Sequence, residues 1–221
     1  MPGADQIAYV DVDSLLRRVY GHAKAGAAHG HAKVGGYPVL LRGLSPLVAT
    51  VCTPLAAPVV AATRLRGGNA GSARGAAGLV AEAIGVARAA GATGQLLVRA
   101  DSAYCSTAVI GACRRATACF SVTIRADAKA RAAIAGIGET AWTAIRYPQA
   151  VWDEAGQCWI SDAEVAETTH TVRAGTRHEL TCRLVVRRVR LPARNALTSC
   201  SRPGGTTHSP PTPPCPLWMP T

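Results

Sequence analysis

Two apolar runs far apart in the chain each end on an aspartate followed by a serine. The runs are Ile7–Ser14 and Gln95–Ser102. A continuous apolar run of this length is typical of a buried strand, so the acid at its end is expected at the rim of a sheet. A carboxylate beside apolar strands is costly unless a cation or hydrogen bonds compensate for it. In a strongly basic chain, the two runs together favour the two halves of one metal site.

Three aspartates are candidates for this site, namely Asp11, Asp13 and Asp101. Asp101 closes the second run. The first run offers two acids, because alternate residues of an extended strand share a face and geometry alone excludes neither of them. The alternative interpretation is that each acid only caps a following helix or turn. One such strand by itself would favour a cap, whereas the pair favours a metal.

The charge of the chain points to a partner that carries phosphates. The 221 residues have a formal net charge of +11. Lysine occurs only at positions 24, 33 and 129, so arginine supplies most of the positive charge. A GC-rich genome would also favour arginine, but the guanidinium group binds phosphate through two hydrogen bonds, which suggests a nucleic acid. Four arginines are candidates for contacts with DNA, namely Arg64, Arg66, Arg74 and Arg99.

Two further stretches are weak candidates for chemistry. The glycine-rich residues 66–75 lack the spacing of a phosphate-binding loop and are followed by no lysine, so they predict a flexible loop without a nucleotide. His22, His29 and His31 lie in a segment rich in Gly and Ala. The H-x-H spacing lacks a second pair of ligands, so residues 21–36 are expected to form a solvated loop.

The eight cysteines contain no C-x-x-C pair. They are therefore interpreted as small buried or incidental residues of a protein in a reducing cytosol, with no disulfide framework and no zinc site. The sequence has neither a signal peptide nor an apolar run long enough to cross a membrane. These features favour a cytoplasmic protein.

The segments between the two acidic runs predict a mixed α/β fold. Residues 37–41, 47–53 and 58–65 read as strands, and three strands with short breaks imply an antiparallel meander. A helix follows, with Ser72 as its N-cap, before the second acidic run. Its apolar face is expected to consist of Ala76, Leu79, Val80, Ala83, Ile84 and Ala87. Beyond Asp101 we expect a helix over 104–115, a strand over 119–125 and a short basic helix over 126–135.

The character of the chain changes after residue 136. Residues 137–191 alternate between apolar and polar and hold most of the tryptophans, which predicts a β-rich insertion with its own aromatic core. Residues 192–221 are rich in Pro, Ser and Thr and contain no acid. Such a composition cannot bury enough apolar surface to order itself, so this part is expected to be a disordered tail. The alternatives are a functional tail and a reading-frame slip in GC-rich codons. The predicted domains are therefore 1–136, 137–191 and 192–221.

The predicted order of elements is that of a ribonuclease-H-like fold, a mixed sheet flanked by helices. Several stretches also resemble the insertion-sequence DDE transposases, and most closely the IS thirteen-eighty family. The resemblance spans roughly residues 7–190, and V-R-A-D-S is its most specific piece. The stretches that carry it are Asp11–Leu15, Thr50–Pro54, Arg64–Gly68, Val98–Tyr104, Asp162–Glu167 and Arg183–Arg188.

The resemblance implies a DNA transposase, which is a polynucleotidyl transferase. In such enzymes three carboxylates hold two divalent metal ions, Mg²⁺ or Mn²⁺, which serve to cut donor DNA and to join the freed end to a target. The implied partners are the transposon ends and the target DNA, together with a second copy of the full-length protein as a homodimer. The resemblance also implies a bacterial protein that is associated with the nucleoid.

Matched residue by residue, the resemblance makes Asp101 the second catalytic acid and metal ligand and favours Asp13 over Asp11 as the first. No stretch matches the motif of the third acid, a glutamate, and the DNA-binding region that precedes the first strand in the family is absent. The chain is therefore expected to be an inactive fragment, truncated at both ends. The alternatives are a nuclease or resolvase of the same fold, and a non-catalytic nucleic-acid-binding remnant whose binding needs neither aspartate nor Mg²⁺.

Overall fold

The chain folds into two compact units, one formed by Met1–Thr123 and the other by Ile124–Trp218. The computed structural model describes residues 1–21, 23–35, 37–145, 152–153, 158–159, 163–189 and 216–218. In this part of the chain no helix is long and apolar enough to cross a membrane.

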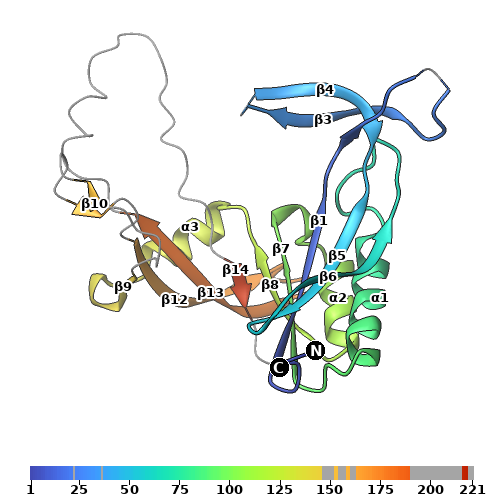
Figure 1. Cartoon of the computed structure of the whole chain (residues 1–221). Coiled ribbons are helices and arrows are strands. Elements are labelled where there is room, and N and C mark those ends of the chain that lie inside the picture. Colours follow the sequence, from blue (N-terminus) through green and yellow to red (C-terminus); the bar gives the residue numbers. More distant parts are fainter. Residues whose placement is uncertain are drawn as a thin grey trace, which may run out of the picture. The chain divides into compact units, whose positions relative to one another are not determined.

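A mixed sheet with β1 (Ile7–Ser14) at its centre organises the first unit (Figure 1). On one side β5 (Leu47–Thr53) pairs antiparallel with β1, and β6 (Ala56–Arg64) pairs antiparallel with β5. On the other side β7 (Gln95–Ala100) runs parallel to β1, and β8 (Cys119–Thr123) runs parallel to β7. The two acid-ended runs are thus neighbouring strands, and the sheet is consistent with the expected ribonuclease-H-like fold.

Helix α1 (Ala76–Ala89) packs on this sheet, where it contacts β1, β5 and β6, and it also contacts α2 (Thr107–Arg115). Every residue of the predicted apolar face of α1 is buried. The predicted cap was wrong, because the helix begins after Gly75, whose φ of 80° lies in the left-handed region that favours glycine. The helix expected over 104–115 is in fact a 3₁₀ turn, η1 (Ser102–Tyr104), followed by α2.

The two faces of β1 differ in character. Ala8, Val10 and Val12 are almost completely buried, as are alternate residues of β5, and they form the core with α1. Because side chains alternate along a strand, Asp11 and Asp13 lie on the opposite face. This second face carries the acids of the predicted site.

A second, three-stranded sheet corrects the expected meander. It has the order β2-β4-β3, with β2 (Arg17–Arg18), β3 (Ala28–Val34) and β4 (Tyr37–Leu44), and it lies at the carboxyl end of β1 (Figure 1). We call residues 17–44 the arm. The prediction of a loop over 21–36 was wrong for residues 28–34, because β3 pairs with β4 along its whole length. Residues 23–27 contain no helix or strand, and His22 lies outside the described residues. The small residues of β3 lack the apolar alternation by which a strand is recognised in a sequence.

The glycine-rich stretch after β6 is closely packed, so the prediction of a flexible loop was wrong. Gly68 is buried, and a Cβ atom there would collide with the carbonyl oxygens of Ala28 and Gly43. A Cβ on Gly30 would likewise collide with the Gly68 carbonyl oxygen. The guanidinium of Arg66 donates hydrogen bonds to the carbonyl oxygens of Ser45, Gly71, Ser72 and Arg74 at 2.8 to 3.1 Å. This stretch therefore fastens the base of the arm to the core.

The second unit contains the sheet β14-β13-β12-β9. The unit starts at Ile124, before the predicted boundary at residue 136, because α3 contacts β12. Most of the tail lies outside the described residues, but β14 pairs antiparallel with β13, so the expected lack of regular structure was wrong for Pro216–Trp218. An open edge of β13 offers unpaired backbone groups to such a strand. The elements are α3 (Ala128–Ala135), η2 (Glu139–Ala141), β9 (Thr143–Ile145), β10 (Trp152–Asp153), β11 (Cys158–Trp159), β12 (Ala163–Val172), β13 (Leu180–Val189) and β14 (Pro216–Trp218).

Most of the described cysteines are buried, as predicted for small core residues. Cys52, Cys113, Cys119 and Cys182 are buried, and Cys105 is half-buried. Burial raises the pKa of the Cys113 thiol to about 12, so this group is an inert part of the core at neutral pH.

Substitution of Gly68 by alanine is expected to lower the free energy of unfolding by about 2 kcal/mol or more, because the new methyl group meets fixed backbone oxygens. The matched control is Gly71→Ala in the same loop, where a Cβ meets no atom within 4 Å and the change should be within about 0.5 kcal/mol. Urea unfolding followed by circular dichroism measures both. Equal stability of the two variants would contradict the close packing described above.

Candidate active site

The parallel pairing of β1 with β7 brings the two predicted acids to neighbouring positions. The register aligns Asp11 with Arg99 and Val12 with Ala100. Asp13 follows Val12 and Asp101 follows Ala100, so this register implies that the two acids are neighbours at the carboxyl ends of adjacent strands. Both residues are exposed. In open α/β sheets ligands bind at this edge.

Each of these carboxylates uses one oxygen for a local backbone contact. Asp101 accepts a hydrogen bond from the Ala103 N–H at 2.9 Å and so caps η1, and Asp13 accepts one from the Ser14 N–H at 2.7 Å. The cap interpretation is therefore correct for Asp101, but the cap uses only one oxygen of the carboxylate. Within the described residues no hydrogen bond or ion pair reaches the second oxygen, Oδ2, of either acid.

The buried phenol of Tyr104 lies close enough to both acids to feel their charge. Its side chain is fully buried, and burial raises the pKa of the hydroxyl. The nearby charges of Asp13 and Asp101 raise this pKa further, while the Ser14 hydroxyl and Arg66 lower it. Although Ser14 is close enough to act on the phenol, the Tyr104 hydroxyl makes no well-aligned hydrogen bond to the described residues. The phenol therefore lies within the electrostatic reach of both carboxylates.

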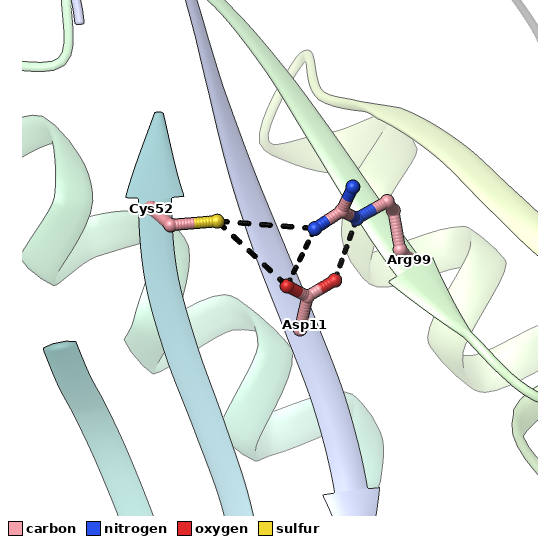
Figure 2. Close-up of polar contacts among 3 residues, drawn as sticks. All are labelled: Asp11, Cys52 and Arg99. Carbon is pink, nitrogen blue, oxygen red and sulfur yellow. Dashed lines mark hydrogen bonds and ion pairs between the residues drawn. The ribbon is translucent and has the colours of Figure 1, made fainter. Parts of the chain in front are cut away.

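Asp11 already has a cation, as Figure 2 shows. The Arg99 Nε and Nη2 atoms lie 2.6 and 2.7 Å from the two oxygens of Asp11, and the guanidinium also lies 4.2 Å from the centre of the Tyr9 ring. The hydrogen bonds to Asp11 raise the pKa of Arg99. Cys52 completes the cluster with its sulfur 3.8 Å from Asp11 Oδ2 and from Arg99 Nη2. Because Asp11 is neutralised in this way, Asp13 is the better candidate for the first acid.

The arginines proposed for DNA differ in their present contacts. Arg64 pairs with Glu82 at 3.1 Å, Arg99 is held by Asp11, and Arg66 is bonded to backbone carbonyls. Burial lowers the pKa of Arg66, which agrees with its role inside the loop. Arg74 is exposed and makes no ion pair within the described part of the chain. The assignment of all four to DNA stays a prediction.

Acids of the second unit have arginine partners of their own. Arg188 binds Glu139 and Glu164 at 2.6 and 2.7 Å and lies 4.0 Å from the centre of the Trp142 ring, while Arg183 binds Glu167 at 3.2 Å. The Glu164 side chain is only 21% exposed, so this acid is half-buried beside its arginine. Across the described ranges no group of three His, Cys, Asp or Glu side chains is placed to hold a metal ion.

The pair Asp13 and Asp101 nevertheless suits a hard divalent cation in its donor chemistry. Carboxylate oxygens are the ligands that Mg²⁺ prefers, and one or two protein carboxylates commonly suffice beside water and substrate phosphates. Each acid keeps an oxygen without a protein partner, and the chain supplies no cation to the pair among the described residues. The site therefore fits one ion, whereas a second ion would need further ligands.

Reasoning from the sequence missed Ser14 and Tyr104 as parts of this site. The only available signal was the D-S-A-Y stretch, in which a tyrosine follows the second acid by three residues. A 3₁₀ turn repeats every three residues, so its last residue turns back toward the residue that caps it.

Substitution of Tyr104 by phenylalanine is expected to raise the free energy of unfolding by about 1 kcal/mol at neutral pH, because a buried hydroxyl without an aligned partner costs stability. Urea unfolding measures the change. The control is Tyr20→Phe at a side chain that is 73% exposed, where the effect should be within about 0.5 kcal/mol. A clear loss of stability in Tyr104→Phe would show that the hydroxyl has a stabilising partner.

The comparisons with known proteins agree with this geometry. No curated protein matches the chain. Residues 4–194 match the family described as transposase DDE domain group 1, which covers both strands that carry the acids. A mixed sheet, two carboxylates on adjacent strands and this match lead to one conclusion: the chain belongs to the DDE transposase domain family.

Proposed function

We propose that this protein carries part of the phosphoryl transfer site of a DDE transposase, with Asp13 and Asp101 as two of the metal ligands and DNA as the substrate. The observation that carries the proposal is the placement of these acids side by side at the ends of two parallel strands. The net charge of +11 supports a polyanionic substrate. Within the family, the resemblance of V-R-A-D-S and its companion stretches supports the IS thirteen-eighty group.

The roles of the chain's own residues follow from their contacts. Asp13 and Asp101 would hold Mg²⁺ or Mn²⁺ through the oxygens that the backbone leaves unused. When bound, such an ion supplies charge stabilisation at the reacting phosphate and lowers the pKa of a coordinated water. The backbone N–H groups of Ser14 and Ala103 orient the two carboxylates, so that little rearrangement is needed on binding.

The neighbouring ion pair tunes the charge of this site. Asp11 lies two residues before Asp13 on the same strand face, and Arg99 lies two residues before Asp101. Because Asp11 and Arg99 neutralise one another, the uncompensated negative charge is confined to the strand ends. Removal of Arg99 would add the charge of Asp11 to the site, and removal of Asp11 would bring an unpaired cation close to it.

Two carboxylates alone hold one divalent ion weakly, and the second ion of the two-metal mechanism needs a third carboxylate. We therefore propose that the described site binds metal and DNA without cutting the strand. Cleavage and strand joining at transposon ends, with a homodimer as the assembled form, belong to a site that a third acid completes.

The metal assignment predicts distinct behaviour for the three aspartates. Asp13→Asn and Asp101→Asn should each weaken Mn²⁺ binding by about tenfold or more, because each removes one of two charged ligands. Asp11→Asn should change the affinity by only a few-fold, since Asp11 is already paired with Arg99. Titration calorimetry with MnCl₂ measures all three variants. A loss in Asp11→Asn that exceeds the loss in Asp13→Asn would reverse the assignment of the first acid.

Strand cleavage is expected to be undetectable when the protein is incubated with supercoiled plasmid and Mn²⁺, because two acids do not fix the second ion. Binding of duplex DNA should be weak, independent of sequence and steeply reduced by salt. The control is Asp101→Ala, because this change would abolish any cleavage by the site and would leave cleavage by a contaminating nuclease unchanged. Nicking by the parent protein and not by this variant would show that a substitute acid completes the site.

A further inference from the structure

The arm carries a concentrated positive charge that the catalytic site does not use. No Asp or Glu occurs between Asp13 and Glu82. Within this interval the described side chains of the arm include four cationic ones, namely Arg17, Arg18, Lys24 and Arg42. Arg17 and Arg18 form β2 and are both exposed. A surface of one sign that lies beside a site for phosphoryl transfer attracts a polyanion by long-range electrostatics.

A hollow on the arm brings two of these groups, Arg18 and Arg42, together. It has a volume of about 350 Å³ and is lined by residues of β2, of β3, of β4 and of the turn after β2. Its polar lining consists of Arg18, His29, Arg42 and the exposed Tyr20. The Arg42 Nη1 atom donates a 2.7 Å hydrogen bond to the Gly21 carbonyl, and the Arg18 guanidinium lies 5.0 Å from the centre of the Tyr20 ring. Two guanidinium groups and an imidazole suit a phosphate group.

The arm is fixed in place relative to Asp13. Only Leu15 and Leu16 separate β1 from β2. The buried Gly68 lies against the backbone of Ala28 and Gly43 from two strands of the arm, and a bridge joins Leu44 to Gly67. A phosphate bound by the arm would therefore stand at a defined distance from the two acids.

We propose that the arm binds the phosphate backbone of duplex DNA beside the reacting phosphate and that the hollow lined by Arg18, His29 and Arg42 receives one of these phosphates. The proposal rests on the proposed function in that DNA is the substrate, and it adds the surface that holds it. One face of the Tyr20 ring is covered by Arg18, which favours contacts with phosphates over the stacking of unpaired bases. The contact carries no sequence information, because phosphates are alike along the duplex.

The test compares two pairs of adjacent arginines in the first unit. The arm variant is Arg17→Gln/Arg18→Gln, and the control is Arg114→Gln/Arg115→Gln at the exposed end of α2, which removes the same charge. Fluorescence anisotropy with a duplex of mixed sequence and no metal gives the affinity over a range of NaCl concentrations. The arm variant should bind about tenfold or more weakly, and its slope of log affinity against log salt should fall in magnitude by about 2. The control should change both quantities much less.

Further variants keep the test decisive. Arg17→Lys/Arg18→Lys retains the charges and should recover most of the salt slope. Should the glutamine variant fail to fold, as judged by circular dichroism, Lys24→Gln at the exposed turn of the arm should still reduce the slope by about 1. Equal losses in the arm variant and the α2 control would overturn the proposal. The proposal would also be overturned if the arm variant lost more affinity for a single strand with the same number of phosphates than for the duplex.

The outcome is separable from that of the proposed function. If Mn²⁺ binding is independent of Asp13 and Asp101 while duplex binding still needs Arg17 and Arg18, the proposed metal site is refuted and the proposed role of the arm is supported. If Mn²⁺ binding needs Asp13 and Asp101 while the arm variant binds the duplex as the control does, the proposed role of the arm is refuted and the proposed metal site is supported.

Discussion

The parallel pairing of β1 with β7 is the constraint on which the candidate site depends. A parallel pair needs a long crossover connection, and here α1 belongs to that connection and covers one face of the sheet. The register is fixed by the buried residues Val10 and Val98, which are aligned with each other and are fully buried. A slip of one residue would send alternate side chains to the wrong face, so burial of the core also determines that Asp13 stands beside Asp101.

The same register separates the acids by charge. Asp11 faces Arg99 across the pair, and the two form a bidentate contact that is partly exposed, so its contribution to stability is modest. Its larger effect is electrostatic. It leaves Asp13 and Asp101 as the uncompensated carboxylates on that face, at the strand ends where solvent and a substrate have access. The fully buried Tyr104 phenol lies close to both.

The elements that could be predicted from the sequence are those that local periodicity determines. Strands β1 and β7 were evident as apolar runs, and the buried face of α1 followed from its 3.6-residue repeat. Strand β3 could not be found, because its residues are small and polar and pair with β4 in an exposed sheet. The roles of Gly68 and Arg66 were also hidden, since they depend on backbone segments that approach from distant parts of the chain. The ion pair between Asp11 and Arg99 could not be predicted either, because it depends on the strand register, which the sequence alone leaves open.

Close backbone contact between the arm and the glycine-rich stretch gives the arm a mechanical role as well as a charge. Binding energy from groups remote from the reacting atoms accelerates a reaction only if it is used for positioning. A flexible arm would let a bound phosphate drift, and misplacement by about 1 Å can cost two orders of magnitude in rate. Gly68 and Gly30 exclude side chains where the two segments cross, and Arg66 ties the crossing to the loop before α1. The backbone crossing at Gly68 and Gly30 depends on segments that are distant in the chain, so it is not visible in the sequence. The same crossing would hold the charges of the arm at a fixed position relative to Asp13.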